Sequence, residues 1–202
     1  MIVVVEGPSA AGKTSWLARW PPDEVVPEHG RVVVPPDRFA DEAVFWSEMN
    51  AARWAQTLAV EARAGHALCD GDPLKLSYDY CLARIGELPW SRFDSGVAAC
   101  TAAIRDRRLG IADAIFCSIP DEATLAARRA GDTSRRRRNF DVNRRLGPAL
   151  ADWYRALDDI DPGRVHWAFP EQVPVGVPGE RYDDGLFARW MARLPRPSTP
   201  PR

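Results

Sequence analysis

The chain has 202 residues, of which 46% are hydrophobic and 27% are charged, and its formal net charge is −1. This length and apolar content suit a single α/β domain over residues 1–194 better than two domains. The near-neutral charge argues against a general nucleic-acid binder, and no apolar run approaches the ~20 residues that a membrane span needs. We therefore expect no nucleic-acid partner and no membrane insertion.

The four cysteines lie far apart in the sequence, without CxxC pairs or neighbouring histidines. This spacing argues against a zinc site and against a disulfide framework. It indicates small buried thiols in a reducing compartment, and we expect a cytoplasmic protein. The residues are Cys69, Cys81, Cys100 and Cys117.

A phosphate-binding loop follows the first predicted strand, the apolar run 2–5. The loop has the pattern GxxxxGKT, and a helix is predicted after it over 14–20. Backbone N–H groups of such a loop wrap a polyphosphate, its lysine contacts the β- and γ-phosphates, and its threonine binds Mg²⁺. The sequence therefore predicts a site for ATP and Mg²⁺ made of Gly7, Pro8, Ser9, Ala10, Ala11, Gly12, Lys13, Thr14 and Ser15.

Beyond this loop, predicted strands and helices alternate to the end of the chain. Short apolar runs predict strands over 23–27, 66–69, 111–119 and 164–169. Helical spacing and proline or glycine stops predict helices over 41–64, 73–86, 94–108, after the cap 120–122, and over 146–157 and 183–194. This alternation predicts a three-layer α/β/α sandwich around a five-stranded parallel sheet, followed by a disordered tail at 195–202.

Acidic residues follow the second and third predicted strands. Since the carboxyl ends of parallel strands share one edge, Glu28, Asp70 and Asp72 should meet the phosphate loop there. Phosphoryl transfer needs one carboxylate as base and another near Mg²⁺. We expect Glu28 or Asp72 to be the base and Asp70 to join Thr14 at the metal. The alternatives are a surface acid at 28 and simple turn chemistry at 70–73.

The chain resembles the P-loop nucleoside and nucleotide kinases, particularly the deoxynucleoside and thymidylate kinases, over roughly its whole ordered length. The resemblance depends on the phosphate loop, on the sequences VPE at 26–28 and CDGD at 69–72, and on the step from 112 to 120. In deoxynucleoside kinases, a glutamate after the second strand is the base, which implies this role for Glu28. Their third strand ends in an acid followed by arginine. Here glycine replaces that arginine, and Lys75 is the candidate substitute, although a solvated lysine is the alternative.

An arginine-rich segment at 128–145 carries eight arginines. Such a run is usually a solvated face and is sometimes a nucleic-acid patch. In P-loop kinases, however, this position holds a mobile lid, so the resemblance implies that at most two or three of the arginines contact the transferring phosphoryl group and that the rest are solvated. Our candidates are Arg128, Arg135 and Arg137.

The acceptor pocket is expected between the long helix 41–64 and the third strand. Trp46 and Trp54 would stack on a base and Gln56 would hydrogen-bond to its edge, with core packing as the alternative for the aromatic residues. Residues 170–175, after the fifth strand, correspond to the adenine site of such kinases.

These observations predict an ATP- and Mg²⁺-dependent kinase that transfers the γ-phosphoryl group to a hydroxyl of a nucleoside or nucleoside-like acceptor. The alternatives are a nucleoside monophosphate kinase, a chloramphenicol-type phosphotransferase and a P-loop ATPase that moves a partner. The chain lacks the Arg-Glu-Pro-Gly pattern of thymidylate kinases, which weakens the first alternative. An apolar helix pair would allow a homodimer.

Overall fold

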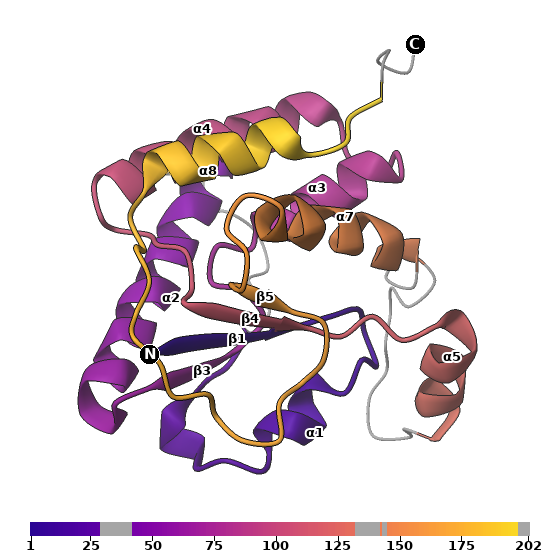
Figure 1. Ribbon diagram of the computed structural model, residues 1–202. Coiled ribbons are helices and arrows are strands. Elements are labelled where there is room, and N and C mark those ends of the chain that lie inside the picture. The colour runs from indigo at the N-terminus through magenta and orange to yellow at the C-terminus, as the bar shows by residue number, and fades with distance from the viewer. Residues whose placement is uncertain (29–41, 132–141, 143–144, 198–202) are drawn as a thin grey trace.

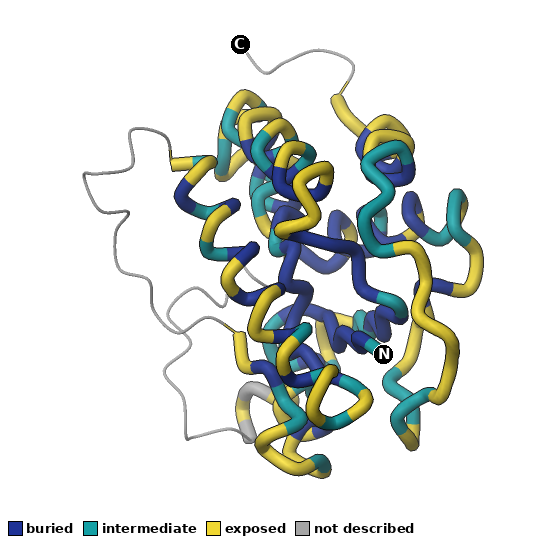
Figure 2. Tube along the Cα trace, turned by 90° about the vertical axis from the view of Figure 1, so that its left-hand side faces the viewer, coloured by how far each residue is buried: buried dark blue, intermediate teal, exposed yellow. Residues whose placement is uncertain are grey.

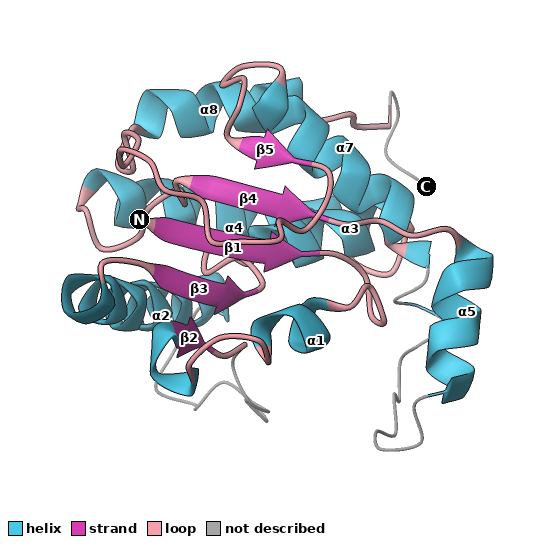
Figure 3. Cartoon of the chain, turned by 60° about the horizontal axis from the view of Figure 1, so that its bottom comes forward, coloured by secondary structure: helices cyan, strands magenta, loops and turns pink. Residues whose placement is uncertain are grey.

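The computed structural model describes residues 1–28, 42–131, 142 and 145–197. Its sheet has five parallel strands in the order β2-β3-β1-β4-β5 (Figure 3). The strands are β1 (Ile2–Glu6), β2 (Val25–Val26), β3 (Ala67–Asp70), β4 (Ala114–Cys117) and β5 (Val165–His166). Because β1 is central, the loop that follows it lies in the middle of one edge of the sheet.

Seven α-helices of the described residues surround this sheet (Figure 1). They are α1 (Lys13–Leu17), α2 (Glu42–Ala64), α3 (Leu76–Arg84), α4 (Trp90–Arg105), α5 (Glu122–Gly131), α7 (Gly147–Asp158) and α8 (Asp184–Arg193), and a 3-10 turn, η1 (Pro22–Glu24), precedes β2. Figure 1 shows α5 standing apart from the rest, beyond the carboxyl ends of the strands. The three-layer fold predicted from the sequence is confirmed. No helix of the described residues is long and apolar enough to cross a membrane.

The two faces of the sheet are covered unequally. Ile2 and Val4 of β1 point into the larger core, under α2, α3, α4, α7 and α8. Val3 and Val5 point to the other face, where α1 and the segment with Phe169 complete a smaller core. The alternation of side chains along β1 thus separates the two cores, and all five residues of β1 are buried. Figure 2 shows the buried residues concentrated in the interior of the molecule.

An aromatic cluster fixes α3 beside the edge of the sheet where the strands end. Tyr80 of α3 and Trp153 of α7 have ring centroids 5.5 Å apart, and Trp190 of α8 lies 4.7 Å from Trp153. Phe93 of α4 packs 5.7 Å from Tyr80. All four side chains are buried, so the cluster joins four helices into one rigid layer.

Several predicted boundaries were wrong for identifiable reasons. The helix predicted over 73–86 begins only at Leu76, because Lys75 adopts a left-handed conformation with φ of 51°. The helix predicted over 94–108 begins at Trp90 and ends at Arg105, and Arg107 has φ of 57°. The strands predicted over 23–27 and 164–169 are two residues each, because both lie at edges of the sheet. Most of the predicted lid and residues 198–202 of the tail lie outside the described residues.

Candidate active site

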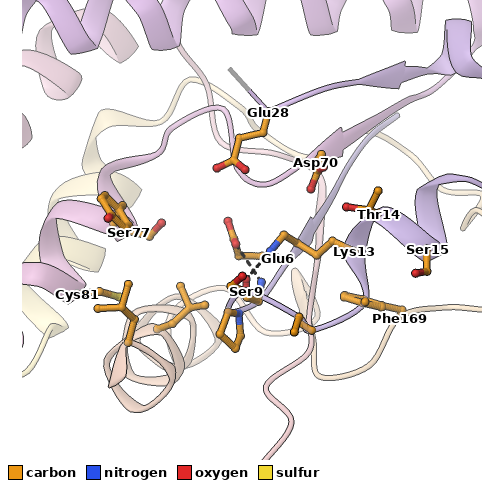
Figure 4. Close-up of a pocket in the computed structure, with 18 of the residues that line it drawn as sticks. Glu6, Ser9, Lys13, Thr14, Ser15, Glu28, Asp70, Ser77, Cys81 and Phe169 are labelled. Atoms are coloured by element: carbon orange, nitrogen blue, oxygen red, sulfur yellow. Dashed lines mark hydrogen bonds between the residues drawn. The ribbon is translucent and has the colours of Figure 1, made fainter. Parts of the chain in front are cut away.

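A cavity of about 1210 Å³ opens where β1, β2 and β3 end. One wall is the phosphate loop, all nine of whose predicted residues line the cavity (Figure 4). The other side chains on the wall come from the strand ends, α3, the region of α7, α5 and the segment after β5. They are Glu6, Glu28, Asp70, Lys75, Ser77, Tyr78, Cys81, Leu146, Leu150, Arg128 and Phe169.

The phosphate loop depends on glycine at its first position. Gly7 has φ of 151°, and a Cβ atom there would lie 2.3 Å from the carbonyl oxygen of Ser118. The loop therefore passes closely over the end of β4, where no side chain fits. Lys13 lies across the loop and donates a hydrogen bond from Nζ to the Gly7 carbonyl at 2.5 Å. These contacts close the loop on itself above the end of β4.

Glu28 and Lys75 form an ion pair on the cavity wall. Burial raises the pKa of Glu28, but the attraction and hydrogen bond of Lys75, together with the attraction of Lys13 and Arg53, outweigh burial, so the pKa lies below its usual value. Burial lowers the pKa of Lys75, and the carboxylates of Glu6 and Glu28 more than compensate for it. The pair is thus charged on both sides at neutral pH. Lys75, proposed from the sequence as a substitute cation, is therefore brought to the predicted base.

Asp70 has an unsatisfied carboxylate oxygen on this wall. Its Oδ1 atom is buried and has no hydrogen-bond partner among the described residues. Burial raises the pKa of Asp70, against the attraction of Lys13. In Figure 4, Asp70 lies between Glu28 and Thr14, with its carboxylate pointing toward the side chain of Lys13.

An unsatisfied carboxylate oxygen and the Thr14 hydroxyl on the wall of one cavity fit Mg²⁺, a hard cation that prefers oxygen ligands. The described residues contain no group of three His, Cys, Asp or Glu side chains that could hold a metal. A Mg²⁺ ion would therefore take most of its ligands from phosphate and water, as is usual for Mg²⁺ at nucleotide sites. The two residues predicted for the metal, Thr14 and Asp70, fit this arrangement.

Asp72 does not reach the cavity, contrary to its predicted role as an alternative base. Only 2% of the residue is exposed, and its Oδ1 atom accepts a hydrogen bond from the backbone of Leu74 at 2.9 Å. Its Oδ2 atom lies 3.5 Å from the hydroxyl of Tyr154. Burial raises the pKa of Asp72 to about 6. The turn chemistry considered as an alternative describes this residue, which leaves Glu28 as the candidate base.

The acceptor wall predicted on α2 is not found in the structure. Trp54 is fully buried, and its indole occupies the space that a Cβ atom of Gly110 would fill. Trp46 is half-buried and donates a hydrogen bond to Glu42, whereas Gln56 is exposed to solvent. None of the three lines the cavity.

The wall facing the phosphate loop comes instead from α3 and from the start of α7. Tyr78 and Cys81 of α3, and Leu146 and Leu150 at α7, line it. Tyr78 is partly exposed, whereas the other three are buried. The helical spacing of residues 78 and 81 was a signal in the sequence, but it gave no indication of which side faced a ligand.

Arg128 of α5 contacts the phosphate loop directly. Its Nη1 atom donates to the Ala11 carbonyl at 2.8 Å. Of the three predicted lid arginines, Arg128 is therefore placed at the loop, and Arg135 and Arg137 lie outside the described residues. A Cβ atom on Gly12 would lie 3.7 Å from Arg128 and 3.9 Å from Phe169, so these two side chains flank one end of the loop.

The segment after β5, predicted to hold adenine, is docked on α1. The indole of Trp16 donates to the Pro170 carbonyl at 2.6 Å, and Arg19 donates to the carbonyl of Glu171 at 2.7 Å. These bonds bring residues 170–171 to the phosphate-loop side of the molecule. Phe169 at the start of this segment lines the cavity.

Arg53 was missed by sequence reasoning, although it supports the whole acidic edge. It is 1% exposed and donates hydrogen bonds to the carbonyls of Pro27, Asp70 and Gly71 at 2.7–3.1 Å. It therefore joins the ends of β2 and β3, which carry Glu28 and Asp70. An arginine on an otherwise apolar stretch of a predicted helix was the available signal.

Comparison with known proteins supports the fold and does not assign a family. No family model matches the chain, and no curated protein matches it. Among solved structures, the chain is similar to deoxyadenosine kinase from M. mycoides, which was determined with the products dCMP and a flexible dCDP. The identity is 11%, the match covers 95% of this chain and 96% of that chain, and the TM-score is 0.54. The chain therefore has a fold similar to that of this kinase, in agreement with the fold that the sequence resemblance implied.

Proposed function

We propose that this protein is an ATP- and Mg²⁺-dependent kinase that transfers the γ-phosphoryl group to a hydroxyl of a nucleoside or nucleoside-like molecule. The observation that carries the proposal is one cavity with two unlike walls. A phosphate loop forms the first, and the Glu28–Lys75 ion pair lies on the second. Donor and acceptor would meet between them.

On the donor side, the backbone of the loop would hold the triphosphate. Lys13 and Arg128 would neutralise the charge that spreads over the phosphoryl oxygens as transfer proceeds. Thr14 would bind Mg²⁺ and Asp70 would hold one of its waters, and the ion would supply further neutralisation of phosphate charge. Arg135 and Arg137 remain candidates to close over the same group. Phe169 and the segment that follows it would contact adenine.

On the acceptor side, Glu28 would accept the proton of the attacking hydroxyl. A bond forms between the acceptor oxygen and the γ-phosphorus while the bond from that phosphorus to ADP breaks. Lys75 would keep the Glu28 carboxylate ionised and oriented. Tyr78 would contact the ring of the acceptor, and Leu146 and Leu150 would give it an apolar floor.

The test is a phosphoryl-transfer screen with labelled ATP. Nucleosides should acquire label, whereas nucleoside monophosphates and chloramphenicol- or aminoglycoside-like alcohols should acquire little. If label accumulates only in inorganic phosphate whatever acceptor is present, the protein is an ATPase and the proposal is wrong. Label in an antibiotic alcohol alone would identify a phosphotransferase of that kind.

One observation favours a second candidate, a nucleoside monophosphate kinase. Lys75 places a cation at the acceptor wall, where an acceptor phosphate would be bound. The Glu28→Gln variant separates the candidates, because a hydroxyl acceptor needs a base and a phosphate acceptor does not. A large loss of turnover supports the hydroxyl, and a small loss supports the phosphate.

The cellular compartment, the lack of a nucleic-acid partner and the oligomeric state of the protein are also proposals. All four cysteines are buried free thiols, a state that suits the reducing cytosol expected from the sequence. The absence of a nucleic-acid partner and the formation of a homodimer are predictions that gel filtration, with and without added DNA, would test.

A further inference from the structure

Glu6 is a buried acid for which the proposed reaction has no use. It is the last residue of β1, it is 6% exposed, and it lines the cavity (Figure 4). One carboxylate oxygen accepts the backbone N–H of Gly7 at 2.9 Å, and the other accepts the backbone N–H of Asp72 at 3.1 Å. Its two oxygens thus hold loops that follow different strands, one loop on each side of the cavity.

The turn that Glu6 holds determines where Lys75 lies. The Asp72 carboxylate accepts the N–H of Leu74, and the Asp72 carbonyl accepts the N–H of Lys75 at 3.1 Å. Lys75 then takes its left-handed conformation as the residue before α3. A non-glycine residue in this region is strained and persists only where its surroundings enforce it. The contact between Glu6 and Asp72 is one of those enforcing contacts.

Glu6 also acts on Lys75 through its charge. A Cβ atom on Gly71 would lie 3.5 Å from the Glu6 carboxylate and 3.7 Å from the Lys75 amine, so both groups converge above this glycine. Burial lowers the pKa of Lys75, the carboxylates of Glu6 and Glu28 raise it, and the guanidinium of Arg53 lowers it. Lys75 also attracts the carboxylate of Asp72 and lowers the pKa of that group. The carboxylates of Glu6 and Glu28 together stabilise the protonated amine of Lys75.

We infer that Glu6 is a positioning residue that joins the two halves of the site, since one oxygen anchors the start of the phosphate loop and the other anchors the turn that presents Lys75 to Glu28. The inference rests on the proposed function insofar as it calls the second half the acceptor side. Glu6 does not need to touch either substrate. It makes the donor cradle and the Glu28–Lys75 pair parts of one rigid unit.

The Glu6→Gln variant tests this inference, because glutamine keeps the shape but has only one accepting oxygen. One of the two backbone N–H groups loses its partner, and the negative charge is removed. The loss of a hydrogen bond to a charged group weakens an equilibrium by about tenfold or more. We expect ATP binding, measured by calorimetry, and the acceptor KM each to worsen by about that factor.

A second measurement isolates the electrostatic effect of Glu6 on Lys75. The chain has only two lysines, Lys13 and Lys75, so protein labelled with ¹³C at the lysine ε position gives two signals, which a Lys75→Arg variant assigns. Glu6→Gln should lower the pKa of Lys75. A loss of stability alone would not move this value in folded protein.

Asp113→Asn is the matched control. The Asp113 side chain is 1% exposed and also accepts a backbone N–H of β1, that of Ile2 at 2.6 Å, but at the opposite end of the strand. This variant should lose stability while ATP binding and the Lys75 titration stay as in the wild type. Equal effects of the two variants on these readouts would overturn the inference.

The inference is also overturned if Glu6→Gln binds ATP normally with an unchanged Lys75 pKa. If that variant does not fold, the test is made on the wild-type protein. The inference expects Lys75 to titrate above the usual lysine pKa of about 10.4. A lower pKa of Lys75 contradicts the inference. A wild type that phosphorylates no acceptor would refute the proposed function instead, while ATP binding and the lysine titration would still test the role of Glu6.

Discussion

The carboxylate of Glu28, which follows β2, is ion-paired with the ammonium group of Lys75, which precedes α3 and lies 47 positions further along the chain. The ion pair connects the loop that follows β2 with the turn that precedes α3, on the wall of the cavity. It therefore couples the ionisation of the candidate base to a residue that the sequence offered only as a substitute cation.

In the Lys75→Met variant, the acid limb of the pH profile of kcat/KM should move to higher pH. Burial raises the pKa of Glu28, and Lys75 opposes this effect more than Lys13 or Arg53 does, so without the lysine the pKa of Glu28 rises. The ionised base then disappears at a higher pH, and the acid limb of kcat/KM moves in the same direction. Lys75→Arg keeps the charge and should leave the limb nearly in place. An unshifted limb in Lys75→Met would show that Glu28 is not the titrating base.

Gly7→Ala should abolish ATP binding. The added Cβ atom would meet the Ser118 carbonyl at 2.3 Å and the Ala11 Cβ at 2.8 Å, so the loop must change shape. Gly163→Ala is the control, because Gly163 also has a positive φ, 91°, but its Cβ would have no neighbour within 4 Å. It should cost about 1 kcal/mol of stability from backbone strain and leave calorimetric ATP affinity unchanged. Equal affinities of the two variants would contradict this prediction.

Lys13→Ala should lower kcat by about 100-fold or more while leaving the melting temperature within a few degrees, since its amine would stabilise charge that develops in the transition state. Within the described residues, the amine makes a hydrogen bond only to the Gly7 carbonyl, so the fold needs it little. Steady-state rates and thermal melts measure both effects. A variant that transfers phosphate at the wild-type rate would mean that the loop has been misassigned.

Asp72→Asn should stabilise the protein at neutral pH and change turnover little. Burial raises the pKa of Asp72 from 3.8 to about 6, so ionisation of this carboxyl opposes folding. The free energy of unfolding therefore falls as the pH rises from 3.8 through about 6. Asparagine does not ionise, so the variant does not show this fall in the free energy of unfolding, which amounts to at most about 3 kcal/mol. Urea unfolding at pH 4 and pH 7.5 should show a difference between variant and wild type only at the higher pH. A large fall in kcat would instead restore Asp72 as a candidate base.

The site could be predicted from the sequence where its chemistry is local. The phosphate loop has its own pattern, and Glu28 and Asp70 follow strands whose carboxyl ends must meet. The sequence did not show that only Asp70 of the two acids lines the cavity, because Gly71, with φ of 77°, turns the chain between the two carboxylates. The sequence DGDP indicated a turn, but it did not indicate the directions that the two carboxylates take.

The acceptor wall could not be predicted because it depends on contacts between distant segments. Trp54 is in the core because Gly110, 56 residues later, leaves room for its indole. Glu6 was overlooked because it ends an apolar strand and precedes a stronger motif. Its partner Asp72 lies 66 residues away. Over the described residues, the order of strands and helices was predicted correctly, since each element has its own hydrophobic period.

The central position of β1 has a consequence for synthesis of the protein. β1 leaves the ribosome before the other strands, yet its neighbours in the sheet are β3 and β4, with Val4 opposite Cys69 and Ile115. A nascent chain that ends before residue 117 therefore holds a strand of four bulky aliphatic side chains with one flank unpaired. Non-local parallel pairing of this kind is slow and exposes such strands to aggregation. We expect this chain to depend on chaperones during translation more than its size alone would suggest.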